Sequence, residues 1–260
     1  MSPHPLPAAL LSRIEDAGLN ASAPTQQRWL DGWLVRLSPG KAKRARCINA
    51  VATGALSLPE KLAQCQALYR SAGLRMLFRV TPFSQPPGLD DWLAQRGYQR
   101  FDDTGVMVCP TLSAGSSASW PDGLQLEHVS PEAYAYIVGE SHHTPAEGCA
   151  AHADRLRHSP VPYSAVVLRD GEGQVVAGAQ VALEAELAGL YDVFTVTRVQ
   201  GRGLSRQLCA HLLAQAHAQG ARVAYLQVDA GNLAARAVYR RLGFSDAYSY
   251  HYRALPSVDD

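Results

Sequence analysis

The stretch that most constrains the fold of this chain is the passage from a strand to a helix between Val193 and Gly220, VFTVTRVQGRGLSRQLCAHLLAQAHAQG. Its β-branched start predicts a strand, and the apolar periodicity after Gly203 predicts a helix. Glycines let the backbone turn sharply and let a ligand approach it closely. Because the first N–H groups of a helix lack intrahelical partners, the turn predicts an anion-binding site. Arg202 and Arg206 would add positive charge there.

Three phosphate-binding patterns compete for such a turn. A Walker A loop requires a lysine directly before a serine or threonine, and none precedes Ser205, so this pattern is excluded. A Rossmann fingerprint requires a third glycine, but Arg206 stands at that position. Asp229, at the end of the next expected strand, keeps a nicotinamide-dependent dehydrogenase open as an alternative. The third pattern, Q/R-x-x-G-x-G/A, is met in full by residues 198–203, RVQGRG.

This third pattern resembles the coenzyme-binding signature of the GNAT superfamily of acyl-CoA-dependent N-acyltransferases. The segment LQVDAGNLAARAVYRRLGF, residues 226–244, is similar to a second signature of that family, and the resemblance spans roughly residues 124–253. It implies an α/β (α+β) fold in which helices flank a mainly antiparallel central sheet. Thr197, Gln200 and Ser205 depart from the commonest residues of the family, but none of the three removes a backbone amide from the turn.

The resemblance also implies which residues bind acetyl-CoA as co-substrate. The strand ending in FTV would splay from its neighbour and pair with the pantetheine arm, while the turn amides would hold the diphosphate. Asn232 would contact the pantetheine, although a helix N-cap is its simpler role. The implied cofactor-binding residues are Phe194, Thr195, Val196, Gln200, Gly201, Arg202, Gly203, Leu204, Ser205, Arg206, Asn232 and Tyr239.

Acyl transfer to an amine requires a proton donor for the leaving thiolate and a base for the amine. The resemblance gives the donor role to Tyr239, which otherwise reads as a core aromatic residue. Asp192, on the strand that leads into the turn, is the candidate base. The alternatives for the base are Glu184, His142 and His143, and the resemblance implies that the two histidines and Glu140 lie in the segment that shapes the acceptor pocket. No metal site is expected, because no regular ligand spacing relates His142, His143, Cys149 and His152.

The first part of the chain echoes the second part. Helix, strand, helix, glycine and strand recur in order, with Gly73 and Gly220 separated by 147 residues and Gly97 and Gly243 by 146. We interpret this as an internal duplication; a chance likeness between generic helix–strand units is the alternative. The expected domains are a degenerate GNAT-like unit at 1–110, a Ser/Gly/Ala-rich linker at 111–123 and a catalytic unit at 124–260.

The first unit lacks the residues that the resemblance assigns to chemistry. Leu93 stands at the position of Tyr239, Pro86 stands at that of Asn232, and the segment VATGALSLPEKL has one glycine and no arginine. We therefore expect this unit to complete the fold or the acceptor cleft. Its basic loop, residues 41–46, is either a solvated hairpin tip or a contribution to substrate or adenine-phosphate binding.

Composition limits the partners of the chain. The formal net charge of +1 makes anion binding local and argues against nucleic-acid and membrane surfaces. Five cysteines without a CxxC pair predict free thiols in a reducing compartment. With no signal peptide and no spanning apolar run, the sequence favours a cytoplasmic location.

Together these features predict a GNAT-type N-acetyltransferase that moves acetyl from acetyl-CoA to a primary amine by direct attack. The amine acceptor would be a small molecule or a peptide. A non-catalytic acyl-CoA sensor with the same fold is the alternative. The sequence does not select the acceptor or a base, and it leaves a homodimer open.

Overall fold

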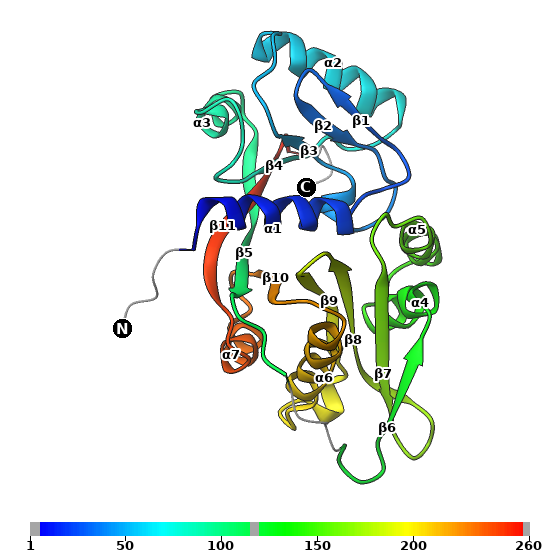
Figure 1. Ribbon diagram of the computed structural model, residues 1–260. Helices are drawn as coiled ribbons and strands as arrows, with labels where there is room; N and C mark the ends of the chain where they lie inside the picture. Colours follow the sequence, from blue (N-terminus) through cyan, green and yellow to red (C-terminus); the bar gives the residue numbers. More distant parts are fainter. Residues whose placement is uncertain (1–5, 115–119, 257–260) are drawn as a thin grey trace.

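The computed structural model describes residues 6–114 and 120–256, so part of the expected linker, 115–119, lies outside the described residues. Figure 1 shows two halves joined through a continuous sheet, with α1 crossing the middle of the molecule. The first half contains α1 (Ala8–Ala21), β1 (Gln27–Leu30), β2 (Trp33–Arg36), η1 (Lys43–Ala45), β3 (Ile48–Ala50), α2 (Leu58–Ser71), β4 (Phe78–Val80), α3 (Leu89–Ala94) and β5 (Gln99–Cys109).

The second half alternates strands and helices around the glycine turn of residues 200–203. It contains β6 (Gln125–Val129), α4 (Pro131–Ser141), α5 (Ala146–Arg157), β7 (Tyr163–Arg169), β8 (Val175–Glu184), β9 (Leu187–Thr195), η2 (Thr197–Val199), α6 (Leu204–Ala218), β10 (Val223–Asp229), α7 (Leu233–Arg241) and β11 (Ser245–Ala254).

Local sequence signals explain where several of these helices begin and end. Ser130 caps α4 by accepting a hydrogen bond from the Ala133 amide at 3.1 Å, and Pro131 occupies the first helical position. Gly243 follows α7 in the left-handed conformation, with φ 88°, which is the usual helix-ending role of glycine. Both helix ends therefore follow from residues within one turn of them.

The described strands form one sheet in the order β1-β2-β3-β4-β11-β5-β10-β9-β8-β7-β6. The β3–β4 and β9–β10 pairs are parallel, whereas the other pairs among the described strands are antiparallel, as the expected fold class requires. Strand β5 of the first half lies between β10 and β11, while β11 of the second half lies between β4 and β5. The two halves therefore exchange one strand each, and the pairing pattern is symmetric about the β11–β5 pair.

Alternation along β5 assigns helices to the two faces of the sheet. Val106 and Val108 pack in one apolar cluster with α1, whereas Met107 and Cys109 pack with α6 in another. Helix α4 packs on the α1 face, against the side chains of β7 that point away from α6. Helices α2 and α3 cover the sheet of the first half.

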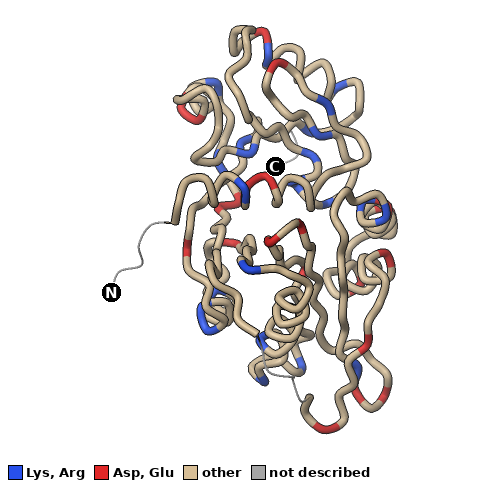
Figure 2. The backbone as a smooth tube through the Cα atoms, viewed as in Figure 1, with Lys and Arg blue, Asp and Glu red and all other residues tan. Residues whose placement is uncertain are grey.

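Charged residues are spread over both halves of the molecule rather than concentrated in one (Figure 2). All five cysteines are buried and free, as their spacing predicts. Among residues 6–114 and 120–256, every helix is too short or too polar to span a membrane.

Candidate functional site

Strands β9 and β10 separate where the site begins. They pair in parallel only from Leu187 to Leu190 of β9, opposite Val223 to Leu226 of β10. Beyond this point β9 continues to pair with β8 as far as Thr195, and its other edge leaves β10. The splay of the strand ending in FTV is therefore confirmed, and it opens a wedge in the sheet.

A β-bulge in β9 shapes the wedge. Gln180 pairs with Tyr191 and Gly178 pairs with Phe194, so one residue of β8 faces two residues of β9. Asp192 lies in this bulge with a left-handed φ of 49°. The Tyr134 hydroxyl donates to the Asp192 carbonyl oxygen at 2.6 Å, and Gln180 Nε2 donates to Asp192 Oδ2 at 2.5 Å. Side-chain contacts thus fix both the backbone and the carboxylate of Asp192.

A cavity of about 460 Å³ lies between the end of β9, the glycine turn and the starts of α6 and α7; we call it the turn cavity. Three of the implied cofactor residues, Val196, Arg202 and Arg206, do not line it, and both arginines are exposed. The remaining implied residues do line it: Phe194, Thr195, Gln200, Gly201, Gly203, Leu204, Ser205, Asn232 and Tyr239.

The glycine turn is open on the cavity side. Gly201 and Gly203 have φ values of 79° and 80°, which side-chain-bearing residues rarely adopt. A Cβ atom placed on either glycine would have no heavy atom within 4 Å. Gln200 Nε2 donates to the Thr195 carbonyl at 3.1 Å and closes the turn against β9. The arrangement presents the first amides of α6 beside unfilled space, which fits an anion.

The corresponding turn of the first half contains an anion of its own. Gly54, which lies 147 residues before Gly201, is also left-handed, with φ 72°. The amides of Ala55 and Leu56 both donate to the Asp31 carboxylate at 2.8 Å, and Lys61 Nζ lies 3.0 Å from Asp31 Oδ2. The Ala55 amide, the Lys61 ammonium and the Leu56 amide lower the pKa of Asp31 to about 2. The amides of this turn are therefore present, but they donate to a carboxylate of the protein itself and are not free to bind a ligand.

Tyr239 and Asn232 each combine a structural position with a place on the cavity wall. Tyr239 is 8% exposed and contacts Phe244 edge to face, with ring centroids 6.2 Å apart. Burial, with a smaller effect of Cys209, raises the pKa of the Tyr239 phenol, so it keeps its proton at neutral pH. Asn232 Oδ1 caps α7 by accepting from the Ala235 amide at 3.0 Å. For both residues the simpler role and the implied role are compatible.

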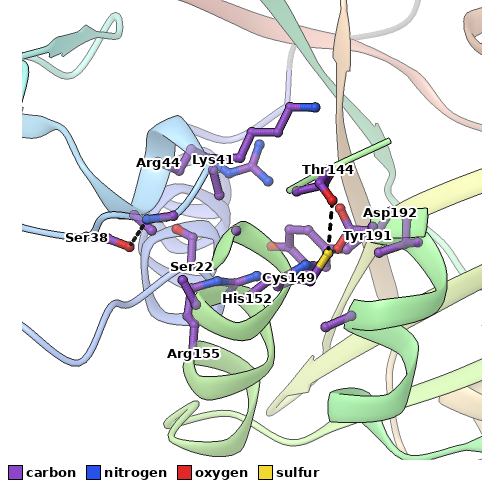
Figure 3. A pocket seen from close by; sticks show the side chains of 18 of the residues that line it. Ser22, Ser38, Lys41, Arg44, Thr144, Cys149, His152, Arg155, Tyr191 and Asp192 are labelled. Carbon is purple, nitrogen blue, oxygen red and sulfur yellow. Dashed lines mark hydrogen bonds and ion pairs between the residues drawn. The ribbon is translucent and has the colours of Figure 1, made fainter. Parts of the chain in front are cut away.

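A second cavity, of about 210 Å³, lies on the α1 face between the two halves; we call it the junction cavity (Figure 3). The first half contributes the end of α1 and the loop around η1, including Lys41 and Arg44. The second half contributes α4, α5 and the end of β9 with Asp192. The basic loop of the first half is thus more than a hairpin tip, because it forms one wall of this cavity.

His152 lies in the site, although its sequence context indicated no role beyond that of a metal ligand, which the ligand spacing argued against. Its Nε2 lies 3.4 Å from Asp192 Oδ2. Burial lowers the pKa of His152; Asp192 acts in the opposite direction, and Arg155 lowers the pKa further. A neutral imidazole beside a carboxylate can accept a proton. The sequence signal was its spacing of three residues from Cys149 on α5, which brings both side chains to the same cavity.

The remaining candidate residues differ in whether they line the junction cavity. His142 lines the cavity, whereas His143 and Glu140 do not. Glu184 also lies outside it, and its Oε1 accepts from Asn20 Nδ2 at 2.8 Å. In the described part of the chain, no three His, Cys, Asp or Glu side chains are grouped so that they could hold a metal ion.

Comparisons with known proteins indicate which family this chain resembles. Residues 126–244 match the model of the acetyltransferase (GNAT) family. Over 246 residues the chain is 29% identical to a Bacillus subtilis (strain 168) protein named uncharacterized N-acetyltransferase YobR, covering 87% of this chain and 91% of the relative. Both comparisons point to an enzyme of the GNAT acetyltransferase type, and proteins of this type use acyl-CoA.

Solved structures share the fold over most of the chain. A GCN5-related N-acetyltransferase from Kribbella flavida aligns with a TM-score of 0.70 at 18% identity, covering 95% of each chain. A tandem GNAT protein from the clavulanic acid biosynthesis pathway aligns with a TM-score of 0.59 at 17% identity, covering 76% of this chain and 70% of the other. At such identities the likeness concerns the fold, and it confirms the expected GNAT-like architecture.

Proposed function

We propose that this GNAT protein transfers an acetyl group from acetyl-CoA to a primary amine by direct attack. The observation that carries the proposal is the turn cavity, in which a splayed strand, an open glycine turn and the Tyr239 ring share one wall. Acetyl-CoA supplies an acetyl group activated as a thioester, so that a new C–N bond replaces a C–S bond. The carboxylate of Asp31 in the equivalent turn of the first half supports anion binding at such amides.

The residues of the chain would then have separate tasks. The amides at the start of α6 would hold the diphosphate, and the free edge of β9 would pair with the pantetheine arm. Tyr239 would donate its phenolic proton to the leaving sulfur. Asp192, with His152 beside it, would take the proton that the amine loses. Asp192 lines the junction cavity while the next residue, Val193, lines the turn cavity, so these two tasks meet across β9.

We also propose that the chain is a duplicated GNAT fold in which only the second half binds the coenzyme. The symmetric strand order supports the duplication. The Asp31–Lys61 pair supports the loss of the first site, because an internal ion pair occupies the turn where a diphosphate would have to enter. The free buried cysteines are compatible with a reducing, cytoplasmic compartment.

Isothermal titration with acetyl-CoA tests the coenzyme site. Ser205→Glu places a carboxylate on the wall of the turn cavity, where a helix start tolerates negative charge. We expect it to weaken binding about tenfold or more by like-charge repulsion between the new carboxylate and the diphosphate, with Ser205→Ala at the same position close to wild type. Arg202→Glu, at the exposed rim, should weaken binding less.

Thiol release from acetyl-CoA over a panel of amines tests the reaction. Turnover with at least one amine is expected, and Tyr239 argues against a role restricted to sensing. If the protein bound acetyl-CoA but released no thiol with any amine of the panel, the sensor hypothesis would replace the enzyme hypothesis. Failure of the wild-type protein to bind acetyl-CoA would contradict the proposal altogether.

A further inference from the structure

The junction cavity has an excess of positive charge that the protein does not neutralise. Lys41, Arg44 and Arg155 line it, and Asp192 is the single carboxylate among its lining residues. In residues 6–114 and 120–256, none of the three cations lies within ion-pair distance of a carboxylate. Cations on the surface of a cavity without counter-charges favour an anionic ligand.

Arg44 is the best-defined of the three cations. Its Nη1 donates to Gln227 Oε1 at 2.6 Å and to the Tyr250 hydroxyl at 3.3 Å, neither of which belongs to a carboxylate. Its Nε is buried and has no hydrogen-bond partner. Glu15, the nearby carboxylate of α1, is bound by Arg79 instead. Arg44 is thus held in one orientation without a carboxylate partner, on the wall of the cavity.

The other two cations extend this surface. Arg155 Nη1 donates to the Ala21 carbonyl at the end of α1, at 2.9 Å, so Arg155 joins α5 to the first half. Lys41 is exposed. In Figure 3, Lys41 and Arg44 lie on one side of the cavity, and Asp192 and Thr144 lie on the other. The cavity therefore separates its positive charge from its one carboxylate.

We propose that the junction cavity binds the acceptor, and that the acceptor is a small amine that also carries a carboxylate or phosphate group. The anionic group binds Arg44 and its neighbouring cations, and the amine lies at the Asp192–His152 end. This inference rests on the proposed acyl transfer and adds the class of its acceptor. A volume of about 210 Å³ is below the range usual for drug-sized ligands, which favours a small molecule.

The position of the amine follows from the bulge in β9. A ligand held by Arg44 lies in the same cavity as Asp192, which adjoins Val193 on the wall of the turn cavity. An ammonium group is attracted to the Asp192 carboxylate and must lose a proton before it can attack a thioester. His152 Nε2, 3.4 Å from that carboxylate, is placed to share the proton. In this arrangement the Asp192–His152 pair lies at the strand that separates the junction cavity from the turn cavity.

Matched amines test the acceptor class in the full-length protein with saturating acetyl-CoA. One arm compares each of the twenty amino acids with its carboxamide, and the other compares phosphoethanolamine with ethanolamine. We expect the anionic member of one arm to have a kcat/KM roughly tenfold to a hundredfold higher, the value of one or two charge-assisted hydrogen bonds. The arm with the larger ratio of kcat/KM between its anionic and neutral members shows whether the acceptor carries a carboxylate or a phosphate. Equal or higher kcat/KM for the neutral members, or for free peptide N-termini, overturns the proposal.

Two substitutions assign the preference to the cavity. Arg44→Met should raise KM for the anionic amine by about tenfold or more and leave the neutral amine unchanged. Because Arg44 is well buried and this variant can misfold, Lys41→Glu provides a second one on an exposed side chain. It should act in the same direction, whereas Arg28→Glu, an exposed arginine on β1, should not change the ratio. A preference that survives both cavity variants contradicts the assignment.

The closing experiment separates this inference from the function on which it rests. Titration of acetyl-CoA reports the turn cavity, and titration of the favoured amine or its neutral partner into the protein without coenzyme reports the junction cavity. Coenzyme binding with no anionic preference refutes only the acceptor class. Absence of coenzyme binding refutes the proposed transfer, and in that case specific binding of the anionic amine, lost in Lys41→Glu, still supports the cavity as an anion site.

Discussion

Gly54 and Gly201 lie 147 residues apart and have nearly the same left-handed backbone, with φ 72° and 79°, in turns that each precede a helix. Around Gly201 a Cβ atom would meet nothing within 4 Å, whereas at Gly54 it would lie 2.3 Å from Asp31 Oδ2. One turn is thus open and the other is filled by a carboxylate of the protein. This contrast explains why two similar turns differ in what they can bind.

Asp31 makes the filled turn sensitive to acid. Its pKa is lowered from 3.8 to about 2 by the amides and by Lys61, so its contribution to stability is present above pH 4 and is lost as pH falls towards 2. We expect Asp31→Asn to lower the thermal midpoint at pH 7, and the difference from wild type to shrink below pH 4 and nearly vanish by pH 2. Thermal melts across this range measure it. Asp122→Asn, at an exposed loop position, should track wild type; a constant gap for Asp31→Asn would disprove the linkage.

Gly203→Ala separates backbone strain from ligand contact in the open turn. Its φ of 80° should cost the folded state about 1 kcal/mol once a Cβ is present. The Cβ also enters the turn cavity, so acetyl-CoA should bind about tenfold more weakly. Gly73→Ala is the matched control: it has φ 64° and equally open surroundings, so it should lose similar stability and keep full affinity. Denaturant unfolding measures the loss of stability, and calorimetric titration measures the affinity for acetyl-CoA. If Gly203→Ala and Gly73→Ala bound acetyl-CoA equally well, the coenzyme would not bind in the turn cavity.

Tyr239→Phe tests the proton donor. It removes one hydroxyl from the cavity wall and keeps the edge-to-face contact with Phe244. We expect kcat to fall on the order of a hundredfold, the usual scale for general acid catalysis, with the affinity for acetyl-CoA within about twofold of wild type. Tyr98→Phe, a buried tyrosine of the first half, is the control and should leave kcat unchanged. If kcat were unchanged in Tyr239→Phe, another group would have to protonate the leaving thiolate.

The parts of the site that could be predicted from the sequence are those built by local signals. The strand, the glycine turn and the capped helices follow from propensities within a few residues, whereas the splay of β9 was implied only by the family resemblance. Asn232 and Tyr239 lie on the cavity wall where their spacing from the turn suggests. Arg202 and Arg206 do not, because the turn directs its glycine amides rather than these side chains to the cavity.

The rest of the site depends on contacts between distant segments. Arg44 and Asp192 share a cavity although 148 residues separate them, and no periodicity links a loop before β3 with a bulge in β9. His152 had no local signal for a role as a base, since its importance comes from the carboxylate 3.4 Å away. The exchange of β5 and β11 is equally non-local, because strand neighbours in the sheet are set by packing rather than by sequence order.

The strand exchange predicts that the second half does not fold alone, even though it contains the whole turn cavity. Residues 104–109 of β5 pair with β10 on one side, and β11 pairs with β5 and β4. A fragment of residues 120–260 would therefore expose the edge of β10 and leave β11 without either neighbour, and such bare edges aggregate. We expect this fragment to be insoluble or to lack a cooperative melt.

Co-expression of that fragment with residues 1–114 should restore a soluble complex that binds acetyl-CoA, because β5 and β4 again supply the missing edges. The matched control is the full chain carrying a protease site between residues 114 and 120, which after cleavage should elute as one species with wild-type affinity. Size-exclusion chromatography and circular dichroism distinguish these outcomes. A soluble, cooperatively melting fragment of 120–260 that binds acetyl-CoA by itself would mean that β10 tolerates a free edge and that the second half is an independent domain after all.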